Sequence, residues 1–480
     1  MTCSSTNTSS SARDLASQAH PTLASSGRDQ SCRSVLDALN DRGELVVIDH
    51  EVDAKFDVSA MLSLVDGAAA VRMNNVRGYD MPVFGNILSS VARVALVLGV
   101  DEKDVQSTIL RSVQQPLAPE VVENAPVQEV VVEKDILTSL PAPYFFSKES
   151  GAYISAGLLI AKDPETGKGN ASYARLKVLG PDRAMIGIAP NHHLAIMARK
   201  AADNGKPLEY AVVLGAHPAI QLAACLYLDL GQDEMHTAGG LLGEPLRVAR
   251  CKTIDLEVPA EAEIVLEGKI YPDELIKEGP VSEYHGMYED YGNGVLTTFS
   301  CMTHRKDAML QVIEPGYHME HIYIAGVSIA ASLKYRLSGI MQNIGEIAVT
   351  ASGCGRNNVV VQVHKPKPGQ ARRIMSLCWG AVSIIKNVTI VDSDVDPWDL
   401  EAVELAKMTR MRAERDILIV TDMPADRSEP QEASSIVAKI GYDATCRPQD
   451  RGQGYDKALP PEEAYERMRT VLKEVRPDLV

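Results

Sequence analysis

Aromatic residues are scarce in this sequence: Phe, Trp and Tyr make up only 5% of the 480 residues, although 45% are hydrophobic. No run of about 18 apolar residues is present, so the sequence predicts no membrane-spanning helix. The net charge is −16, which argues against binding to nucleic acid because the phosphate backbone would be repelled. The composition is that of a soluble globular protein with two or three domains.

The sequence also lacks any CxxC pair, although it contains eight cysteines. In a chain of this length, scattered cysteines are typical of free thiols in a reducing compartment, and not of a disulfide framework or a zinc site. We therefore expect a cytoplasmic protein. The cysteines are Cys3, Cys32, Cys225, Cys251, Cys301, Cys354, Cys378 and Cys446.

Several motifs that would indicate a common activity are missing. There is no GxxxxGK[ST], no GxGxxG after a strand and no GxSxG, which excludes phosphate-loop, dinucleotide and serine-hydrolase signatures. The stretch DSDVDP (392–397) has acids at positions 1, 3 and 5 of a calcium loop. Pro397 and Val403 stand where that loop requires glycine and glutamate, so the calcium interpretation fails.

The pattern along the chain divides it into five parts. Residues 1–30 are rich in Ser and Thr and predict a disordered tail. Residues 31–120 mix helix and strand, and residues 121–307 are rich in strands. In residues 308–455, strands such as AMLQVIE, EIAVTA, NVVVQVH, NVTIVD and DILIVTD alternate with helical segments, which predicts an α/β domain. Residues 456–480 predict a helix whose apolar face must dock, on the chain's own core or on a second subunit.

Two carboxylates lie five residues apart in EGPVSEYHG (278–286). The Gly-Pro pair after Glu278 indicates a loop, and loops on a rigid scaffold often carry chemistry. For an arbitrary pair of acids, a solvated surface turn is the simpler interpretation. Glu278 and Glu283 gain a functional interpretation only from the rest of the sequence.

A scattered polar set lies in the strand-rich middle of the chain. Arg175 follows Asn170 in a strand-like run, where a guanidinium needs an acidic partner or an anionic ligand. His192 and His193 stand at a helix start, where simple capping is the alternative, and Glu234 precedes a glycine pair. Asn, His and Glu together suit manganese or magnesium. Their separation in sequence does not by itself define a site.

The stretches DLEVPAEAEIVLEG (255–268) and EGPVSEYHG resemble the signature of the UbiD-like family of reversible, prenylated-FMN-dependent decarboxylases, relatives of 3-octaprenyl-4-hydroxybenzoate carboxy-lyase. The resemblance continues through YARLKVLG, GKPLEYAVVLGAHPAIQLAA and NVTIVDSDVDPWDL, over about residues 33–450. It implies an α+β and α/β fold. A flavin-reductase-like split β-barrel would hold cofactor and metal in residues 121–307, and an α/β oligomerisation domain would follow in residues 308–455.

The resemblance also assigns site residues. The catalytic set falls on Arg175, Glu278 and Glu283. The metal ligands, which clamp the cofactor phosphate, fall on Asn170, His193 and Glu234. The further residues implied for cofactor binding are Ser172, Tyr173, Ala174, Arg175, His192 and the phosphate-binding Lys386.

The same resemblance implies cofactors and partners. The cofactors are prenylated FMN, Mn²⁺ (or Mg²⁺), and K⁺ held by backbone oxygens around Ala223, Ala224 and Leu226. The partners are a small aromatic acid, CO2 and a flavin prenyltransferase that supplies the cofactor. The protein is expected to be a homodimer or a higher homo-oligomer, with no nucleic-acid or membrane partner.

These assignments fit the chemistry of decarboxylation at an sp² carbon. The departing CO2 leaves an electron pair for which no side chain is an adequate sink, so a cofactor must supply one. Arg175 would hold the substrate carboxylate, Glu278 would orient Arg175, and Glu283 would deliver the proton that replaces CO2. A kinked loop can bring both acids to one guanidinium.

The substrate is expected to be a pyrrole-, indole- or hydroxybenzoate-type acid. The stretch EPGYHMEHIYIAG (314–326) is rich in His and Met, and we interpret it as a pocket wall from which His318 or His321 reaches the substrate ring. His192 stands where many relatives carry Gln or Arg, and Val281 and Ser282 also depart from the family pattern. The alternative functions are a flavin reductase, for which no nicotinamide site is visible, and a non-catalytic flavin carrier.

Overall fold

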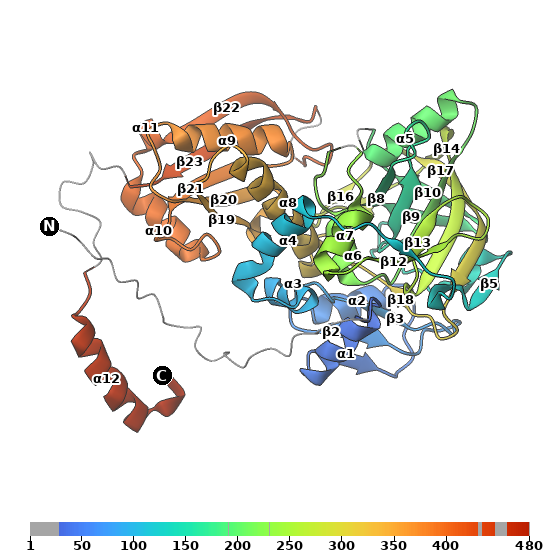
Figure 1. The fold of residues 1–480 in the computed structure, drawn as a ribbon, viewed down its shortest axis with the longest axis horizontal. Coiled ribbons are helices and arrows are strands. Elements are labelled where there is room, and N and C mark those ends of the chain that lie inside the picture. The colour runs from blue at the N-terminus through green and yellow to red at the C-terminus, as the bar shows by residue number, and fades with distance from the viewer. Residues whose placement is uncertain (1–27, 191, 230, 431–433, 447–457, 480) are drawn as a thin grey trace.

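Of the five sheets in the described residues, the three largest organise the chain, and one long helix lies between the last two of these (Figure 1). The computed structural model describes residues 28–190, 192–229, 231–430, 434–446 and 458–479. Residues 1–27 of the predicted tail, and Cys3 among them, lie outside the described residues. The seven described cysteines are all free, as predicted. Within the same residues, no helix is both long enough and apolar enough to cross a membrane.

The N-terminal unit is a small sheet with helices. Its elements are α1 (Arg33–Asp41), β1 (Leu45–Ile48), α2 (Asp57–Leu64), β2 (Ala70–Met73), β3 (Val83–Gly85), α3 (Val91–Leu98), η1 (Glu102–Asp104) and α4 (Val105–Gln114). Helix α1 ends two residues before Gly43, which has φ +69°, and β1 follows this turn.

One predicted strand belongs to a different sheet from the one expected. AMLQVIE was assigned to the C-terminal α/β domain, but β18 (Leu310–Gln311) pairs in parallel with β3 of the N-terminal unit, in the order β1-β2-β3-β18. The prediction was wrong about the sheet because pairing over more than 200 residues leaves no signal in local periodicity.

The middle unit is built on a nine-stranded sheet that curls into a half-barrel (Figure 1). Its path is β6-β9-β10-β17-β14-β11-β7-β8, and β5 pairs with β17. The elements are β4 (Glu120–Val121), η2 (Pro126–Gln128), β5 (Val130–Val132), η3 (Ile136–Ser139), β6 (Tyr153–Ile154), β7 (Leu158–Lys162), β8 (Gly169–Tyr173), β9 (Arg175–Gly180), β10 (Arg183–Gly187), α5 (His193–Asp203), β11 (Leu208–Leu214), α6 (Pro218–Ala224), α7 (Glu234–Leu242), β12 (Arg247–Arg250), β13 (Glu257–Pro259), β14 (Ile264–Lys277), β15 (Val281–Ser282), β16 (Tyr288–Glu289) and β17 (Asn293–His304).

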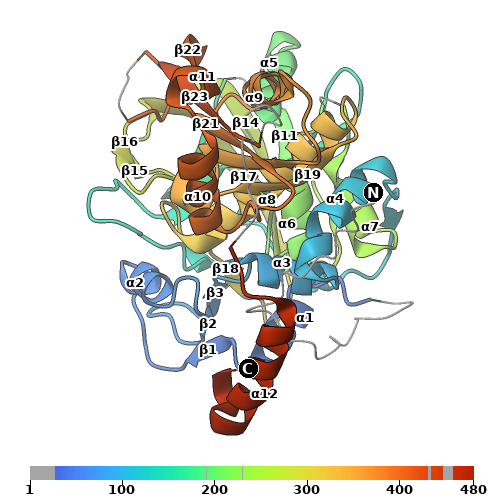
Figure 2. The same cartoon turned by 90° about the vertical axis from the view of Figure 1, so that its left-hand side faces the viewer.

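The C-terminal unit is the predicted α/β arrangement. Its sheet has the order β19-β20-β21-β23-β22, in which β20, β21 and β23 are parallel. The elements are α8 (Met319–Ser338), β19 (Ile344–Val349), η4 (Ala351–Gly353), β20 (Asn358–Val363), α9 (Gln370–Ala381), β21 (Asn387–Asp392), α10 (Leu400–Arg410), α11 (Ala413–Asp416), β22 (Ile417–Pro424) and β23 (Ile436–Ala444). Helix α9 packs on one face of the sheet and α10 on the other (Figure 2).

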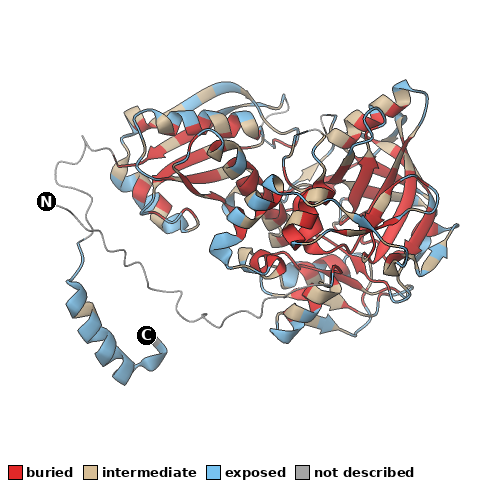
Figure 3. Ribbon diagram, viewed as in Figure 1, coloured by how far each residue is buried: buried red, intermediate tan, exposed pale blue. Residues whose placement is uncertain are grey.

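Burial explains how α8 joins the units (Figure 3). The N-terminal unit and the half-barrel share one hydrophobic core, and the C-terminal unit has its own. Ile324 and Val327 of α8 belong to the first core, and Ile329 and Leu333 belong to the second. A helix that is apolar on several faces is normally buried between layers, and α8 has this role here.

The first turn of α8 is also tied to the N-terminal unit. The Glu320 carboxylate accepts hydrogen bonds from the backbone N–H groups of Asn86 (2.8 Å), Ile87 (2.8 Å) and Leu88 (3.0 Å). Burial raises the pKa of Glu320 to about 7, although these three donors lower it. The contact fixes where α8 begins.

The C-terminal helix α12 (Glu462–Val475), which is followed by η6 (Pro477–Leu479), has no buried residue. Met468 and Val475 on its apolar side are 57% and 70% exposed. The helix therefore does not pack on the chain's own core in this structure. Docking on a second subunit stays a prediction.

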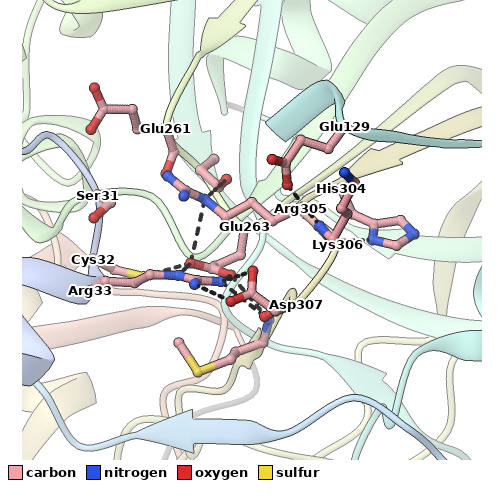
Figure 4. Close-up of polar contacts among 12 residues, drawn as sticks. Ser31, Cys32, Arg33, Glu129, Glu261, Glu263, His304, Arg305, Lys306 and Asp307 are labelled. Carbon is pink, nitrogen blue, oxygen red and sulfur yellow. Dashed lines mark hydrogen bonds and ion pairs between the residues drawn. The ribbon is translucent and has the colours of Figure 1, made fainter. Parts of the chain in front are cut away.

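A buried carboxylate joins the start of the chain to the half-barrel (Figure 4). Glu263 is 0% exposed, and Arg33 donates to both of its oxygens at 2.7 and 2.8 Å. The Met309 N–H donates to the same group at 3.1 Å, and the Arg305 guanidinium lies 3.7 Å away. Arg33 also pairs with the exposed Asp307 at 2.7 Å. One acid thus holds α1, β14 and the chain beyond β17 together.

We expect Glu263→Ala to lower the free energy of unfolding by about 3–5 kcal/mol, because it leaves two guanidinium groups without their buried partner. Asp307→Asn removes the other partner of Arg33 at a side chain that is 74% exposed, and should change stability by less than about 1 kcal/mol. Urea unfolding followed by circular dichroism measures both variants. Equal losses of unfolding free energy in the two variants would mean that the buried Glu263 stabilises the fold no more than the exposed Asp307 does.

Candidate active site

Arg175 brings the two predicted loop acids together. It is the first residue of β9, and its Nε and Nη2 donate to the two oxygens of Glu278 at 2.5 and 2.7 Å. Its Nη1 reaches Glu283 Oε1 at 3.4 Å. Glu278 is 1% exposed. The convergence predicted for Arg175, Glu278 and Glu283 is therefore present, and the surface-turn alternative does not fit a buried bidentate pair.

Tyr291 covers the other side of this group. Its ring lies under the Arg175 guanidinium at 5.0 Å and under that of Arg427 at 4.0 Å. Burial raises the pKa of Tyr291, and the neighbouring Glu283 carboxylate raises it further, so the phenol stays protonated. Arg427 belongs to the segment after β22. The C-terminal unit also contacts residues 278–286, which we call the acid loop, because the Ser428 carbonyl lies 3.0 Å from His285 Nε2.

The backbone of the acid loop is held from behind. The Glu278 carbonyl accepts from Lys177 Nζ at 2.7 Å and from Ser150 Oγ at 2.5 Å. Lys177 lies two residues after Arg175, so both side chains project from the same face of β9. Gly279 has φ +82°, and a Cβ at this position would lie 2.9 Å from Ser150 Oγ. Glycine is therefore required at the turn that aims Glu278 at Arg175.

A third acid lies behind the loop. Glu149 is 3% exposed, and its carboxylate accepts from the backbone N–H of Phe146 at 3.2 Å and of Ser282 at 3.4 Å. Burial raises the pKa of Glu149 to about 7. Residues 149 and 150 thus support both ends of the acid loop.

Asn170 and Glu234 form the core of the predicted metal site. The Asn170 amide donates to both Glu234 oxygens at 3.2 Å, and the Ala171 N–H donates to Oε2 at 2.8 Å. Asn170 Oδ1 and Ser172 Oγ are buried and have no hydrogen-bond partner among the described residues. Burial raises the pKa of Glu234 to about 8. A desolvated carboxylate beside unpaired oxygens fits a hard divalent cation.

His193 lies at the start of α5, which packs against β8, but no hydrogen bond or ion pair joins it to Asn170 or Glu234. In the described part of the chain, no three His, Cys, Asp or Glu side chains are grouped to hold a metal. The predicted set contains only two such residues and an amide, so it stays a prediction. A cavity of about 220 Å³ adjoins Asn170 and is also lined by Asp233 and His236.

The structure also places the other residues that were predicted to bind the cofactor. His192 caps α5 by accepting from the Leu194 N–H, and burial lowers its pKa to about 4, so it is neutral. The Tyr173 hydroxyl is buried and has no partner among the described residues, and Ala174 connects β8 to β9. Lys386, just before β21, forms an ion pair with the buried Glu429 at 3.0 Å. The structure therefore places Lys386 on the C-terminal unit.

The two histidines of the predicted pocket wall differ. His318 directly precedes α8, but its side chain makes no capping hydrogen bond; Nδ1 lies 3.3 Å from Glu314 and 3.7 Å from Asp66, and the ring stacks on Phe146. Burial lowers the pKa of His318, but the nearby Asp66 and Glu314 carboxylates outweigh burial and raise it overall. His321 is different because protein atoms occupy both of its ring nitrogens: Nδ1 contacts the Gly316 carbonyl and Nε2 contacts Arg356.

Sequence reasoning missed the residues that support the site. Lys177 could have been predicted to lie near Arg175, because the two residues are two apart on one strand and so share a face. Ser150, Tyr291 and Arg427 gave no such signal, because they approach the acid loop from distant parts of the chain.

Family models match most of the chain. The N-terminal, Rift-related and C-terminal domains of 3-octaprenyl-4-hydroxybenzoate carboxy-lyase match residues 36–113, 120–318 and 322–444. The chain belongs to the UbiD family. The UbiD resemblance predicted from EGPVSEYHG and its companion stretches is confirmed.

Solved UbiD-class structures share this fold. HmfF from Pelotomaculum thermopropionicum, in complex with FMN, is 33% identical with a TM-score of 0.86, over 91% of this chain and 98% of that chain. Vanillic acid decarboxylase from Sedimentibacter hydroxybenzoicus, in closed form, is 27% identical with a TM-score of 0.83, over 92% and 99%. Among curated UbiD relatives, anhydromevalonate phosphate decarboxylase of Methanosarcina mazei is 30% identical over 90% of this chain and 99% of its own length. These relatives support a decarboxylase.

We expect Glu234→Ala to yield protein largely free of manganese and flavin, because it removes the carboxylate to which the Asn170 amide is bonded. His193→Ala should do the same if it is the third ligand. Glu257→Ala is the control: it removes a carboxylate from the lining of the cavity beside Asn170 and should keep both manganese and flavin. Metal analysis and flavin absorbance of purified protein provide the measurement. Full occupancy in Glu234→Ala would contradict the site.

Proposed function

We propose that this UbiD-family chain is a reversible, non-oxidative decarboxylase of an aromatic or heteroaromatic carboxylic acid that uses prenylated FMN. The observation that carries the proposal is the bidentate Arg175–Glu278 pair with Glu283 at 3.4 Å from the same guanidinium. The HmfF complexes with FMN and with prFMN support the cofactor. The curled sheet would be the split barrel of the cofactor domain.

The prenylated flavin, when bound, supplies the electron sink that no side chain offers. Arg175 orients the substrate carboxylate, and Glu278 keeps the guanidinium in place. As the C–C bond to the carboxylate breaks, CO2 leaves and its electron pair stays with the ring carbon. Glu283 gives its proton to that carbon and takes another from solvent, so each turnover consumes one proton. The reverse reaction returns the proton to Glu283.

Asn170, His193 and Glu234 would hold Mn²⁺ or Mg²⁺ against the cofactor phosphate, and Lys386 would contact the same phosphate from the C-terminal unit. K⁺ would bind near Ala223, Ala224 and Leu226. A flavin prenyltransferase would supply the cofactor, and the protein would act as a homodimer or higher oligomer. A flavin reductase or a flavin carrier would not need Arg175, Glu278 and Glu283 together.

The acid itself would be of the pyrrole, indole or hydroxybenzoate type. The name of the curated relatives supports a second candidate, an unsaturated aliphatic acid that also carries a phosphate. Protein co-expressed with a flavin prenyltransferase, assayed for CO2 release and ¹³C-bicarbonate exchange across both classes of acid, tests the proposal. Absence of both signals for every acid would overturn it.

We expect Glu283→Gln to abolish CO2 release while the flavin stays bound, because the amide cannot donate the proton and no metal ligand is lost. The loss should be at least about 100-fold, the scale of general acid catalysis. Glu289→Gln, on the far strand of the same hairpin, is the matched control and should keep activity. Near wild-type release by Glu283→Gln would exclude it as the donor.

We expect His318→Ala to change which acid is preferred. A polar group that bonds a ring N–H or O–H discriminates strongly against analogues that lack it. The measurement is kcat/KM for a heteroaromatic acid against its carbocyclic analogue. An unchanged ratio would place His318 outside the pocket, with a role only as the partner of the Glu314 and Asp66 carboxylates.

A further inference from the structure

Arg356 lies where the C-terminal unit meets the acid loop. It follows η4, and its guanidinium stacks on the ring of Tyr284, the residue after Glu283, at 4.9 Å. Nη2 contacts His321 Nε2 at 3.0 Å, and Nη1 donates to the Cys354 carbonyl at 3.3 Å. The acid loop, α8 and the turn before β20 therefore all contact one arginine.

These partners of Arg356 are all neutral. Burial, and then the charge of Arg356, lower the pKa of His321 to about 3, so this imidazole carries no charge at neutral pH. Its Nε2 accepts from Arg356, and its Nδ1 donates to the Gly316 carbonyl at 3.1 Å. The Cys354 carbonyl and the Tyr284 ring add no formal charge. His321 thus positions the guanidinium without compensating it.

Within the described residues, Arg356 differs from Arg175 and Lys386 in having no carboxylate partner. Arg175 has two carboxylates, and Lys386 has Glu429 at 3.0 Å. Arg356 forms no ion pair with any residue that the structure describes. The nearby Asp426 carboxylate is bonded to the N–H and hydroxyl of Ser428 in its own turn. Arg356 therefore has no carboxylate in direct contact among the described residues, and a guanidinium in that state suits a carboxylate or phosphate.

We propose that Arg356 binds a second anionic group of the substrate, a carboxylate or a phosphate, in addition to the carboxylate that Arg175 orients. This inference rests on the proposed function and narrows its substrate to dianionic acids. The substrate is favoured over the cofactor phosphate as the source of the anion because Arg356 touches Tyr284 and His321 on the acid-loop side. The Asn170–Glu234 pair assigned to the cofactor phosphate makes none of these contacts.

The test compares matched acids on full-length protein carrying its flavin. Binding is measured by calorimetry for benzoate and benzene-1,4-dicarboxylate, for pyrrole-2-carboxylate and pyrrole-2,5-dicarboxylate, and for benzoate and 4-phosphonobenzoate. The wild type should bind at least one dianion about tenfold more tightly than its monoacid, and Arg356→Gln should lose that advantage. The affinity for the monoacids should change by less than about twofold.

Three further variants separate charge from folding. Arg356→Lys keeps a cation and should keep part of the preference for dianions that Arg356→Gln loses. His321→Phe removes the acceptor that positions the guanidinium and should lose the preference for dianions. Arg373→Gln removes an exposed arginine of α9 and should behave as the wild type. Thermal unfolding of each variant identifies any effect that comes only from stability.

A wild type that prefers no dianion overturns the proposal, as does an Arg356→Gln variant that keeps the preference. FMN affinity is measured in parallel: if Arg356→Gln weakens FMN and leaves the acid preference intact, the anion is the cofactor phosphate and the proposal is wrong. CO2 release is a separate readout. If the protein prefers dianions but releases CO2 from no acid, the proposed decarboxylase function is wrong, and the inference that Arg356 binds an anionic group is retained.

Discussion

The buried pair between Arg175 and Glu278 is the interaction on which the candidate site depends. A guanidinium at this depth requires a carboxylate, and Glu278 can reach it only because Gly279 turns the chain with a positive φ. Ser150 and Lys177 then satisfy the carbonyl of Glu278, and Tyr291 covers the guanidinium. Glu283 is brought into reach because it directly follows β15, the two-residue strand that begins three residues after Glu278.

Buried acids also join the three units. Glu263 fixes α1 to the half-barrel, and Glu320 fixes α8 to residues 86–88 of the N-terminal unit. These carboxylates are bonded to groups from distant parts of the chain, so each is satisfied only when the units are correctly docked. Removing one partner of such a pair costs far more than losing an exposed ion pair. The relative position of the units is therefore specified by polar contacts as well as by the shared core.

The site is composite for the same reason. In the proposed site, the half-barrel would supply Arg175, Asn170 and Glu234, and the C-terminal unit would supply Lys386, Arg427 and Arg356. Any change in the contact between the two units would move cations relative to the acid loop.

The amino-acid sequence was enough to predict strands β19, β20, β21 and β22 of the C-terminal sheet, the loop at 278–286 and the family, but not β23. These features depend on local periodicity, on a Gly-Pro turn and on contiguous motifs. It also indicated that Arg175 needs an acid, because a guanidinium in an apolar strand has few alternatives. Three features emerge only in three dimensions: β18 joins the N-terminal sheet, α12 buries no residue against the described part of the chain, and His321 contacts Arg356. Such contacts join residues far apart in sequence, and their free energy depends on packing that no local pattern encodes.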